Sequence, residues 1–112
     1  METQSLPENV VLVKLSASEP QISNELKELN ETVSQNSECD VVVDFSYVEI
    51  INSSNISNLL LLRGFLKEHN RRLILYNVQT ITRCIFVVAG LIDAFVFIDG
   101  MEDVLKAVQS VS

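Results

Sequence analysis

The chain has 112 residues and a formal net charge of −7, with 15 acidic residues against 8 basic ones. The length fits one compact domain, and 47% hydrophobic residues are enough for a packed core. The acidic balance argues against nucleic-acid binding, which needs Lys and Arg to neutralise phosphates. The only basic pair, Arg71 and Arg72, is expected to cap a helix end.

No apolar run approaches the roughly 20 residues that cross a bilayer, and the polar first residues do not resemble a secretory signal peptide. We therefore expect a cytoplasmic protein.

Four apolar segments, each followed by a segment with helical periodicity, set the order of the predicted elements. Because strands that alternate with helices form parallel sheets, this order predicts an α/β fold with a mainly parallel sheet of four to five strands and about four helices. We assign residues 9–112 to this single small domain and residues 1–8 to an N-terminal segment. The predicted strands cover 10–15, 41–45, 73–76 and 95–98. The first predicted helix begins after its N-cap Ser18 and ends at 34–37, the next two cover about 54–69 and 78–89, and the last is opened by residues 99–102 and ends at about 109.

Apolar spacing assigns the face that each helix buries. Ser18 and Gln21 form a capping-box pattern at the first helix, and Asp99 and Glu102 form another at the last. Gly90 is placed to end the third helix. The residues expected to be buried are Ile22, Leu26, Leu29 and Val33 in the first helix, Ile81, Ile85 and Val88 in the third, and Val104, Leu105 and Val108 in the last.

No arrangement in the sequence indicates catalysis or cofactor binding. A phosphate-binding glycine motif is absent. His69, the sole histidine, lies at a helix end, where it is favourably placed near the terminal carbonyls. Cys39 and Cys84 are isolated and are expected to be reduced, mostly buried thiols. We therefore expect neither an enzyme nor a cofactor or metal site, and we expect Asp44 to accept backbone donors in the loop after its strand.

The second helix carries two apolar faces. One stripe joins Ile56 and Leu60 to Arg63 and Lys67 at spacings of about one turn. Exposed aliphatic residues rimmed by charge are typical of protein-binding faces, but packing of Ile56 and Leu60 on a neighbouring helix of the same domain fits equally well. The other face, expected to pack on the sheet, collects Leu59, Leu62, Phe65 and Leu66, with Leu61 at its edge.

A polar turn, residues 52–55, begins this helix; we call it the Ser53 turn. Asn52, Ser53 or Ser54 could each cap the helix by accepting a free backbone N–H. Ser53 projects to the same sector as Ile56 and Leu60, so phosphorylation is the alternative role for its hydroxyl. A phosphate adds about −1.5 to −2 charge at pH 7. The helix dipole tolerates that charge at an N-terminus, so the fold would survive while the binding face changed sign.

Four segments in this order resemble the STAS domain family, named for sulphate transporters and anti-sigma factor antagonists. Family members similarly show an apolar strand ending in Asp, then Asp-Ser-Ser-Gly before a Leu-rich helix. A strand ending in Asn-Val and a helix closing in Gly-Leu follow. The four segments here are VVVDFSYVEI (41–50), NSSNISNLLLL (52–62), RRLILYNV (71–78) and IFVVAGLIDAFVFI (85–98), within a resemblance that spans about 10–108.

The resemblance implies a STAS-like regulatory module without catalytic activity that takes part in partner switching. The unphosphorylated form binds an anti-sigma factor that is also a serine kinase, and phosphorylation of the serine that matches Ser53 abolishes binding. Ser53 is therefore the phosphorylation candidate. We assign partner binding to Asn52, Ser53, Ser54, Asn55, Ile56, Leu60, Arg63 and Lys67.

The resemblance also leaves a second functional hypothesis open, because other members build stress-signalling assemblies or serve transport systems as accessory subunits. A scaffold or accessory subunit that never switches is thus the alternative function. Under either hypothesis the expected partner is a regulatory protein, and we expect neither nucleic-acid binding nor membrane insertion. The sequence leaves the oligomeric state open, a homodimer included.

The sequence departs from the family at the Ser53 turn, where Asn52 and Asn55 replace the Asp and the Gly. Asn caps helices and tolerates unusual backbone angles, so the fold should not suffer. The missing carboxylate, however, removes a charge beside Ser53 that a kinase or partner would read. Ser54 and Ser57 are the other hydroxyl candidates.

Overall fold

The computed structural model describes residues 1–7, 9–36 and 38–109, and these form five strands, four α-helices and one short 3-10 helix. The predicted order of strands and helices is confirmed, with one strand added in front. The strands are β1 (Glu2–Leu6), β2 (Val10–Lys14), β3 (Asp40–Asp44), β4 (Leu73–Tyr76) and β5 (Val96–Ile98). The helices are α1 (Gln21–Gln35), α2 (Ser53–Glu68), α3 (Thr80–Val88), η1 (Ile92–Ala94) and α4 (Met101–Gln109).

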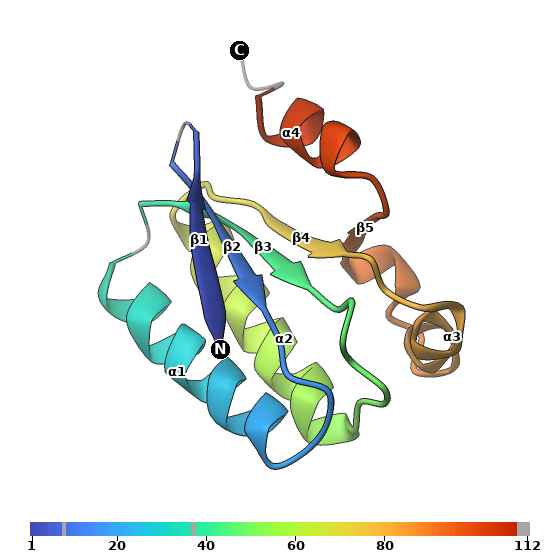
Figure 1. The fold of residues 1–112 in the computed structure, drawn as a ribbon. Coiled ribbons are helices and arrows are strands. Elements are labelled where there is room, and N and C mark those ends of the chain that lie inside the picture. The colour runs from blue at the N-terminus through green and yellow to red at the C-terminus, as the bar shows by residue number, and fades with distance from the viewer. Residues whose placement is uncertain (8, 37, 110–112) are drawn as a thin grey trace.

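The five strands form one mixed sheet in the order β1-β2-β3-β4-β5 (Figure 1). Neighbouring strands from β2 to β5 run parallel, as expected for strands joined by helical crossovers. Only β1 runs antiparallel, and it pairs with β2 at the edge. The sheet is therefore mainly parallel, as the sequence predicts.

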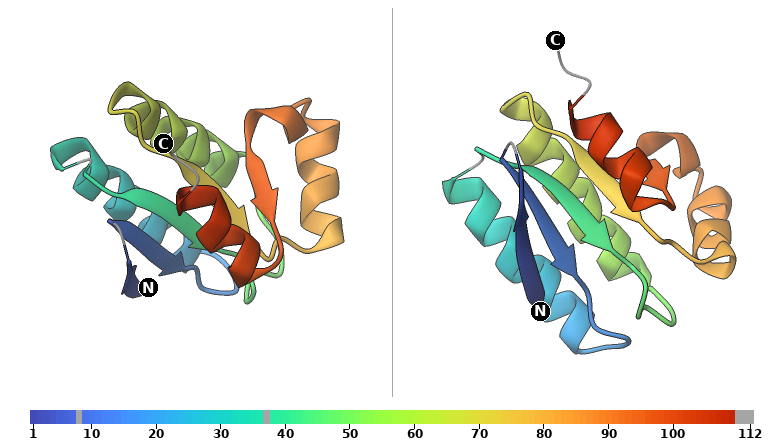
Figure 2. Two further views of the ribbon diagram at one scale, coloured as in Figure 1. Left: turned by 90° about the horizontal axis from the view of Figure 1, so that it is seen from above. Right: turned by 45° about the horizontal axis from the view of Figure 1, so that its top comes forward.

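Helices cover both faces of the sheet. Figures 1 and 2 show α1 and α2 side by side on one face, α4 on the other, and α3 at the end of the sheet near β5. Every residue of β3 is buried, which explains why its sequence is an unbroken apolar run between two aspartates. Val104 and Val108 of α4 close the smaller apolar cluster, while α1 and α2 close the larger one.

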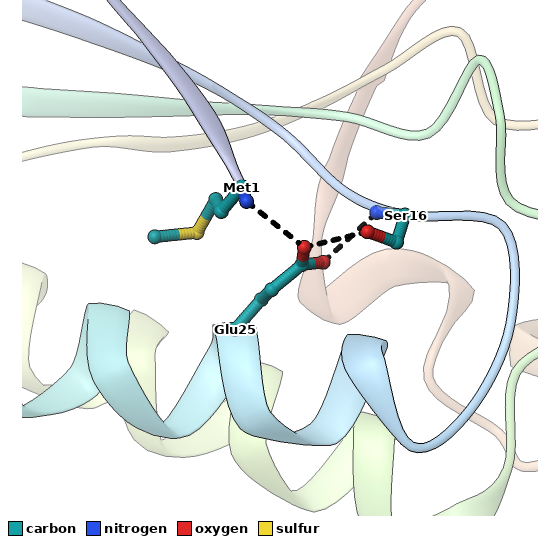
Figure 3. Close-up of polar contacts among 3 residues, drawn as sticks. All are labelled: Met1, Ser16 and Glu25. Atoms are coloured by element: carbon teal, nitrogen blue, oxygen red, sulfur yellow. Dashed lines mark hydrogen bonds and ion pairs between the residues drawn. The ribbon is translucent and has the colours of Figure 1, made fainter.

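Strand β1 is an edge strand whose polar sequence does not predict a strand. Residues 2–5 are exposed and Leu6 is half-buried, so no apolar alternation marks the strand. A buried glutamate ties this end of the chain to α1 (Figure 3). The Glu25 carboxylate lies 3.2 Å from the Met1 amine and accepts hydrogen bonds from Ser16, at 2.8 Å from the backbone N–H and 2.6 Å from the hydroxyl.

Two predicted capping boxes are wrong. Helix α1 follows Pro20 and has no side-chain cap; Ser18 contributes only its carbonyl, which accepts from the backbone N–H of Ile22. The carboxylate of Glu19 takes the place of a cap by accepting the backbone N–H of Ser23 at 2.7 Å. At α4, the carboxylate of Asp99 instead accepts from Arg83 at 2.6 Å.

Helix α3 buries a different face from the predicted one. Of the three predicted residues, Ile81 and Val88 are 67% and 88% exposed, and Ile85 is half-buried against the core; Thr82 and Phe86 are buried instead. Phe86 packs edge-to-face on Phe95 and Phe97, with ring centroids 5.4 and 5.2 Å apart. Since burying a phenylalanine removes more apolar surface from water than burying a valine, Phe86 determines which side of this apolar helix faces inward.

The other predicted faces agree with the structure. The four apolar residues of α1 are buried, as are Val104 and Val108 in α4, whereas Leu105 is half-buried. Gly90 follows α3 with φ at +74°, in the left-handed region where glycine has no steric cost.

Candidate functional site

Polar side chains fix the carboxyl ends of β3 and β4, where the chain enters the loop before α2. Asp44 accepts the backbone N–H of Ser46 at 2.8 Å, so its predicted role in the loop is confirmed. The Asn77 amide donates to the Ser46 hydroxyl at 3.1 Å and thereby links the loops after the two strands. Asn77 has φ at 56°, which an asparagine adopts more readily than most residues. These contacts anchor the start of the loop that leads to the Ser53 turn.

The Ser53 turn is capped by two asparagines that bond to each other. Asn52 is the N-cap of α2: its side-chain oxygen accepts the backbone N–H of Asn55 at 2.9 Å. In return, the side-chain oxygen of Asn55 accepts the backbone N–H of Asn52 at 3.0 Å. This reciprocal capping box satisfies two backbone donors that a helix N-terminus otherwise leaves unpaired. The two departures from the family pattern thus work as one structural unit.

A carboxylate from the β2–α1 loop reaches the same turn. Glu19 accepts from the side-chain amide of Asn52 at 3.3 Å and from both the backbone and the hydroxyl of Ser23. The amide of Asn55 donates to the Ser23 hydroxyl at 3.2 Å, which closes the ring of contacts. Hydrogen bonds from Ser23, and more weakly from Asn52 and Asn55, lower the pKa of Glu19, so a negative charge persists beside the turn.

Sequence reasoning missed Glu19 and Ser23. They precede the Ser53 turn by about thirty residues, and no periodicity connects them with it. Asn52 replaces the aspartate of the family pattern, and the carboxylate beside the turn is supplied by Glu19 from the loop before α1.

The hydroxyls of Ser53 and Ser54 are exposed and free. Both residues lie in the first turn of α2, and neither side chain hydrogen bonds within the described residues, because Asn52 already provides the cap. Asn55, in contrast, is fully buried. Among the polar residues of the turn, only Asn52, Ser53 and Ser54 are thus accessible to another molecule.

Beside Ser53 lies a shallow groove between the start of α2 and α3, with a volume of about 530 Å³. We call it the apolar groove. Its α3 wall includes the three residues that the sequence predicts to be buried on that helix, Ile81, Ile85 and Val88. The lining residues are Ile51, Asn52, Ser53 and Ile56 on one side and Ile81, Cys84, Ile85, Val88 and Ala89 on the other.

The apolar groove contradicts one cysteine prediction and extends the site. Cys84 is exposed in it, not buried, whereas Cys39 is half-buried; both are free thiols. An exposed apolar surface of this kind typically marks a place where a protein or ligand binds. The sequence pattern of α3 contained these residues but assigned them to the core.

The predicted stripe along α2 does not form one surface. Ile56 is buried and belongs to the core below the apolar groove, which agrees with the packing alternative. Leu60 is 37% exposed, in agreement with the surface alternative. Arg63 and Lys67 line a separate groove near the other end of the helix. The structure thus brings Ser53 and Ile56 together with α3 and separates them from the two basic residues.

Among residues 1–7, 9–36 and 38–109, no group of three or more His, Cys, Asp or Glu side chains is arranged to hold a metal ion. Nor does any helix in this part of the chain combine the length and the apolar character needed to span a bilayer.

No protein-family model matches the sequence, and no curated protein matches it either. The structure, in contrast, is similar to several solved ones. The protein tm1081 of Thermotoga maritima has a TM-score of 0.83 at 12% identity, over 96% of this chain and 93% of that one.

Two further structures indicate the range of proteins with this fold. The anti-sigma factor antagonist SpoIIAA in its unphosphorylated form has a TM-score of 0.79 at 16% identity, covering 99% of this chain and 97% of its own. A sulfate transporter family protein from Wolinella succinogenes has a TM-score of 0.78 at 15% identity, covering 96% and 90%.

The chain therefore has the STAS-domain fold, and the resemblance read from its sequence is confirmed at the level of the fold. One similar structure, at 15% identity and a TM-score of 0.76, is that of an anti-sigma-factor antagonist (STAS) domain protein from Planctomyces limnophilus. These identities are low, so the fold is what the comparison establishes.

Proposed function

We propose that the protein is a cytoplasmic regulatory domain of the anti-sigma factor antagonist type, which binds an anti-sigma factor that is also a serine kinase. The observation that carries this proposal is the apolar groove, which opens beside a free hydroxyl at the start of α2. Such a surface supplies apolar area for a protein partner and a modifiable group at its rim. The partner contacts Asn52, Ser53 and Ser54, the groove walls and Leu60, while buried Asn55 shapes the turn from beneath.

Phosphorylation of Ser53 switches binding off in this proposal. The first turn of α2 offers unpaired backbone donors and the positive end of the helix dipole, so a phosphate there costs the fold little. A partner that covers the apolar groove would have to bury that doubly charged group, which is strongly unfavourable without compensating cations. The groove lining contains none. Glu19 keeps a second negative charge near the turn and supplies the carboxylate that a kinase reads.

The test is to compare Ser53→Asp with Ser54→Asp, because the two substitutions place the same charge in the same helical turn. Of these two serines, Ser53 lines the apolar groove and Ser54 does not. Ser53→Asp should weaken binding of the kinase partner about tenfold or more, which a calorimetric titration measures. Ser54→Asp should bind almost as the unmodified protein does, and both variants should unfold at the same temperature. Equal affinity of Ser53→Asp and the unmodified protein would count against the proposal.

The alternative function is a STAS scaffold or accessory subunit that does not switch. Two observations favour it: the family Asp and Gly are replaced by an asparagine pair that serves the fold, and the sulfate transporter family protein shares the structure. Incubation with the kinase partner and ATP, followed by intact-mass measurement, separates the two functions. Added phosphate that disappears in Ser53→Ala supports the switch, whereas an unchanged mass supports the scaffold.

A further inference from the structure

Half of the basic residues of this acidic chain line one groove near the far end of α2. They come from the second half of the helix and from the loop before β4, and they surround a volume of about 370 Å³. We call this the basic groove. The whole chain has 8 basic residues, and the four that lie here are Arg63, Lys67, Arg71 and Arg72, over a floor of Leu73, Ile74, Val96 and Ala107.

The fold does not neutralise three of these cations. Arg63, Lys67 and Arg71 form no ion pair within the described part of the chain. Arg72 is held in place: its guanidinium donates to the carbonyl of Ala107 in α4, and its backbone N–H donates to Asp40 at 2.8 Å. A cleft lined by charges of one sign focuses its field on whatever enters it. The clustered cations therefore repel one another without a counter-charge and attract an anion.

Capping of α2 does not account for the cluster. The carbonyl of Phe65 lies 3.0 Å from the Nδ1 atom of His69, as predicted for a histidine at a helix end. Leu66 and Lys67 have their carbonyls bonded to backbone N–H groups of the following loop. The helix dipole favours cations only within the last turn, and Arg63 lies ahead of that turn.

We propose that the basic groove binds an extended acidic segment of a partner protein. Arg63 and Lys67 are four residues apart on α2, which is about 6 Å along the helix axis. Alternate residues of an extended chain are about 6.6 Å apart, so carboxylates at alternate positions would meet successive cations. The arginine forks bind carboxylates with two parallel hydrogen bonds, and the apolar floor receives the stems of the acidic side chains.

A short acidic segment fits this surface better than a larger polyanion does. Nucleic acids and anionic membranes extend well beyond four cations, and the rest of this molecule carries a net negative charge. Neutralising several phosphates at once needs a wider basic surface. A peptide confined to the groove avoids that repulsion.

The experiment measures fluorescence anisotropy of a labelled peptide of alternating glutamate and alanine. The same peptide with glutamine in place of glutamate is the control ligand. Wild-type protein should bind the glutamate peptide, and the double variant Arg63→Glu/Arg71→Glu should bind it at least about tenfold more weakly. The matched control Lys27→Glu/Lys106→Glu changes the net charge equally outside the groove and should lose less than about twofold. Ser53→Asp should bind as wild type does, since Ser53 lies about 15 Å from Arg63 along α2.

Several outcomes would overturn the proposal. They are equal losses in the two double variants, equal binding of the glutamine peptide, and tighter binding of single-stranded RNA or of vesicles containing anionic lipid. Thermal unfolding of both double variants shows whether they remain folded. If Arg63→Glu/Arg71→Glu does not fold, Arg63→Gln/Arg71→Gln replaces it, with Lys27→Gln/Lys106→Gln as its control. Because Ser53 is not involved, the outcome is independent of the proposed switch.

Discussion

At the residue scale, a buried amide organises the Ser53 turn. Asn55 occupies the third position of α2, caps the helix start together with Asn52, and reaches across to Ser23 on α1. The side-chain amide of Asn52 also donates to Glu19, whose charge lies beside the N-cap. The residues that carry the turn are therefore fully occupied, and the two serines between them remain free for another molecule.

Asn52→Asp tests the contact between the turn and Glu19. The new carboxylate can still cap Asn55, but it loses the donor to Glu19 and places a second negative charge 3.3 Å or so from the first. We expect Asn52→Asp to be less favourable in the wild-type background than in Glu19→Gln, with a coupling of about 0.5–1 kcal/mol that solvent screening keeps small. Urea unfolding of the four proteins at neutral pH measures it. Additive effects of the two substitutions would show that Glu19 does not contact Asn52 in solution.

At the element scale, α3 has an apolar residue on almost every side, so it can bury only part of its apolar surface against the sheet. Phe86 is fully buried and anchors the helix, while Ile81, Val87 and Val88 remain exposed. A helix of this composition at the end of a sheet is an interaction surface unless another element covers it. Its position beside the Ser53 turn joins the two into one site.

The two faces of α3 should respond differently to substitution. Phe86→Ala should cost about 3–5 kcal/mol of unfolding free energy because it leaves a cavity in the core. Val88→Asp should change stability by less than about 0.5 kcal/mol, yet weaken binding of the kinase partner. Leu61→Asp, at an exposed leucine of α2 outside the apolar groove, is the control and should leave binding unchanged. A large stability loss in Val88→Asp would contradict the assigned face.

Sequence patterns predicted the strands well and the surface poorly, for physical reasons. Strand β4 was predicted with its observed bounds because a buried central strand is apolar throughout. Strand β1 was missed because an edge strand exposed to water does not need apolar residues. The face of α3 was wrong because its periodic apolar residues, Ile81 and Val88 among them, lie on the outer side, while Phe86 on another side is buried. Glu19 could not be found, since its contact with the turn depends on tertiary structure.

At the scale of the whole molecule, Glu25 connects strand, loop and helix, and its contacts make stability depend on pH. Burial raises the pKa of Glu25, but hydrogen bonds from Ser16 and the nearby Met1 amine outweigh that effect and leave it below its ordinary value of 4.5. The folded state therefore favours the ionised carboxylate. Its contribution to stability is fully present above about pH 4.5 and is lost as the pH falls through the lowered pKa.

Glu25→Gln should accordingly destabilise the protein by about 1–2 kcal/mol at neutral pH, because hydrogen bonds to a charged group are replaced by weaker ones. The difference from wild type should shrink as the pH falls below the ordinary pKa. Urea unfolding followed by circular dichroism at several pH values measures both proteins. A difference that stays constant down to acid pH would show that the charge of Glu25 does not contribute.

The Ser53 turn and the apolar groove together form the proposed partner-binding surface. Chemical-shift mapping on the isotope-labelled protein, titrated with an anti-sigma factor kinase that binds it, tests this most directly. We predict that the perturbed amides gather at residues 51–57 and 81–89, and that phosphorylation of Ser53 abolishes the changes. Perturbations confined to β1, α1 or α4, or unchanged binding after phosphorylation, would contradict the account.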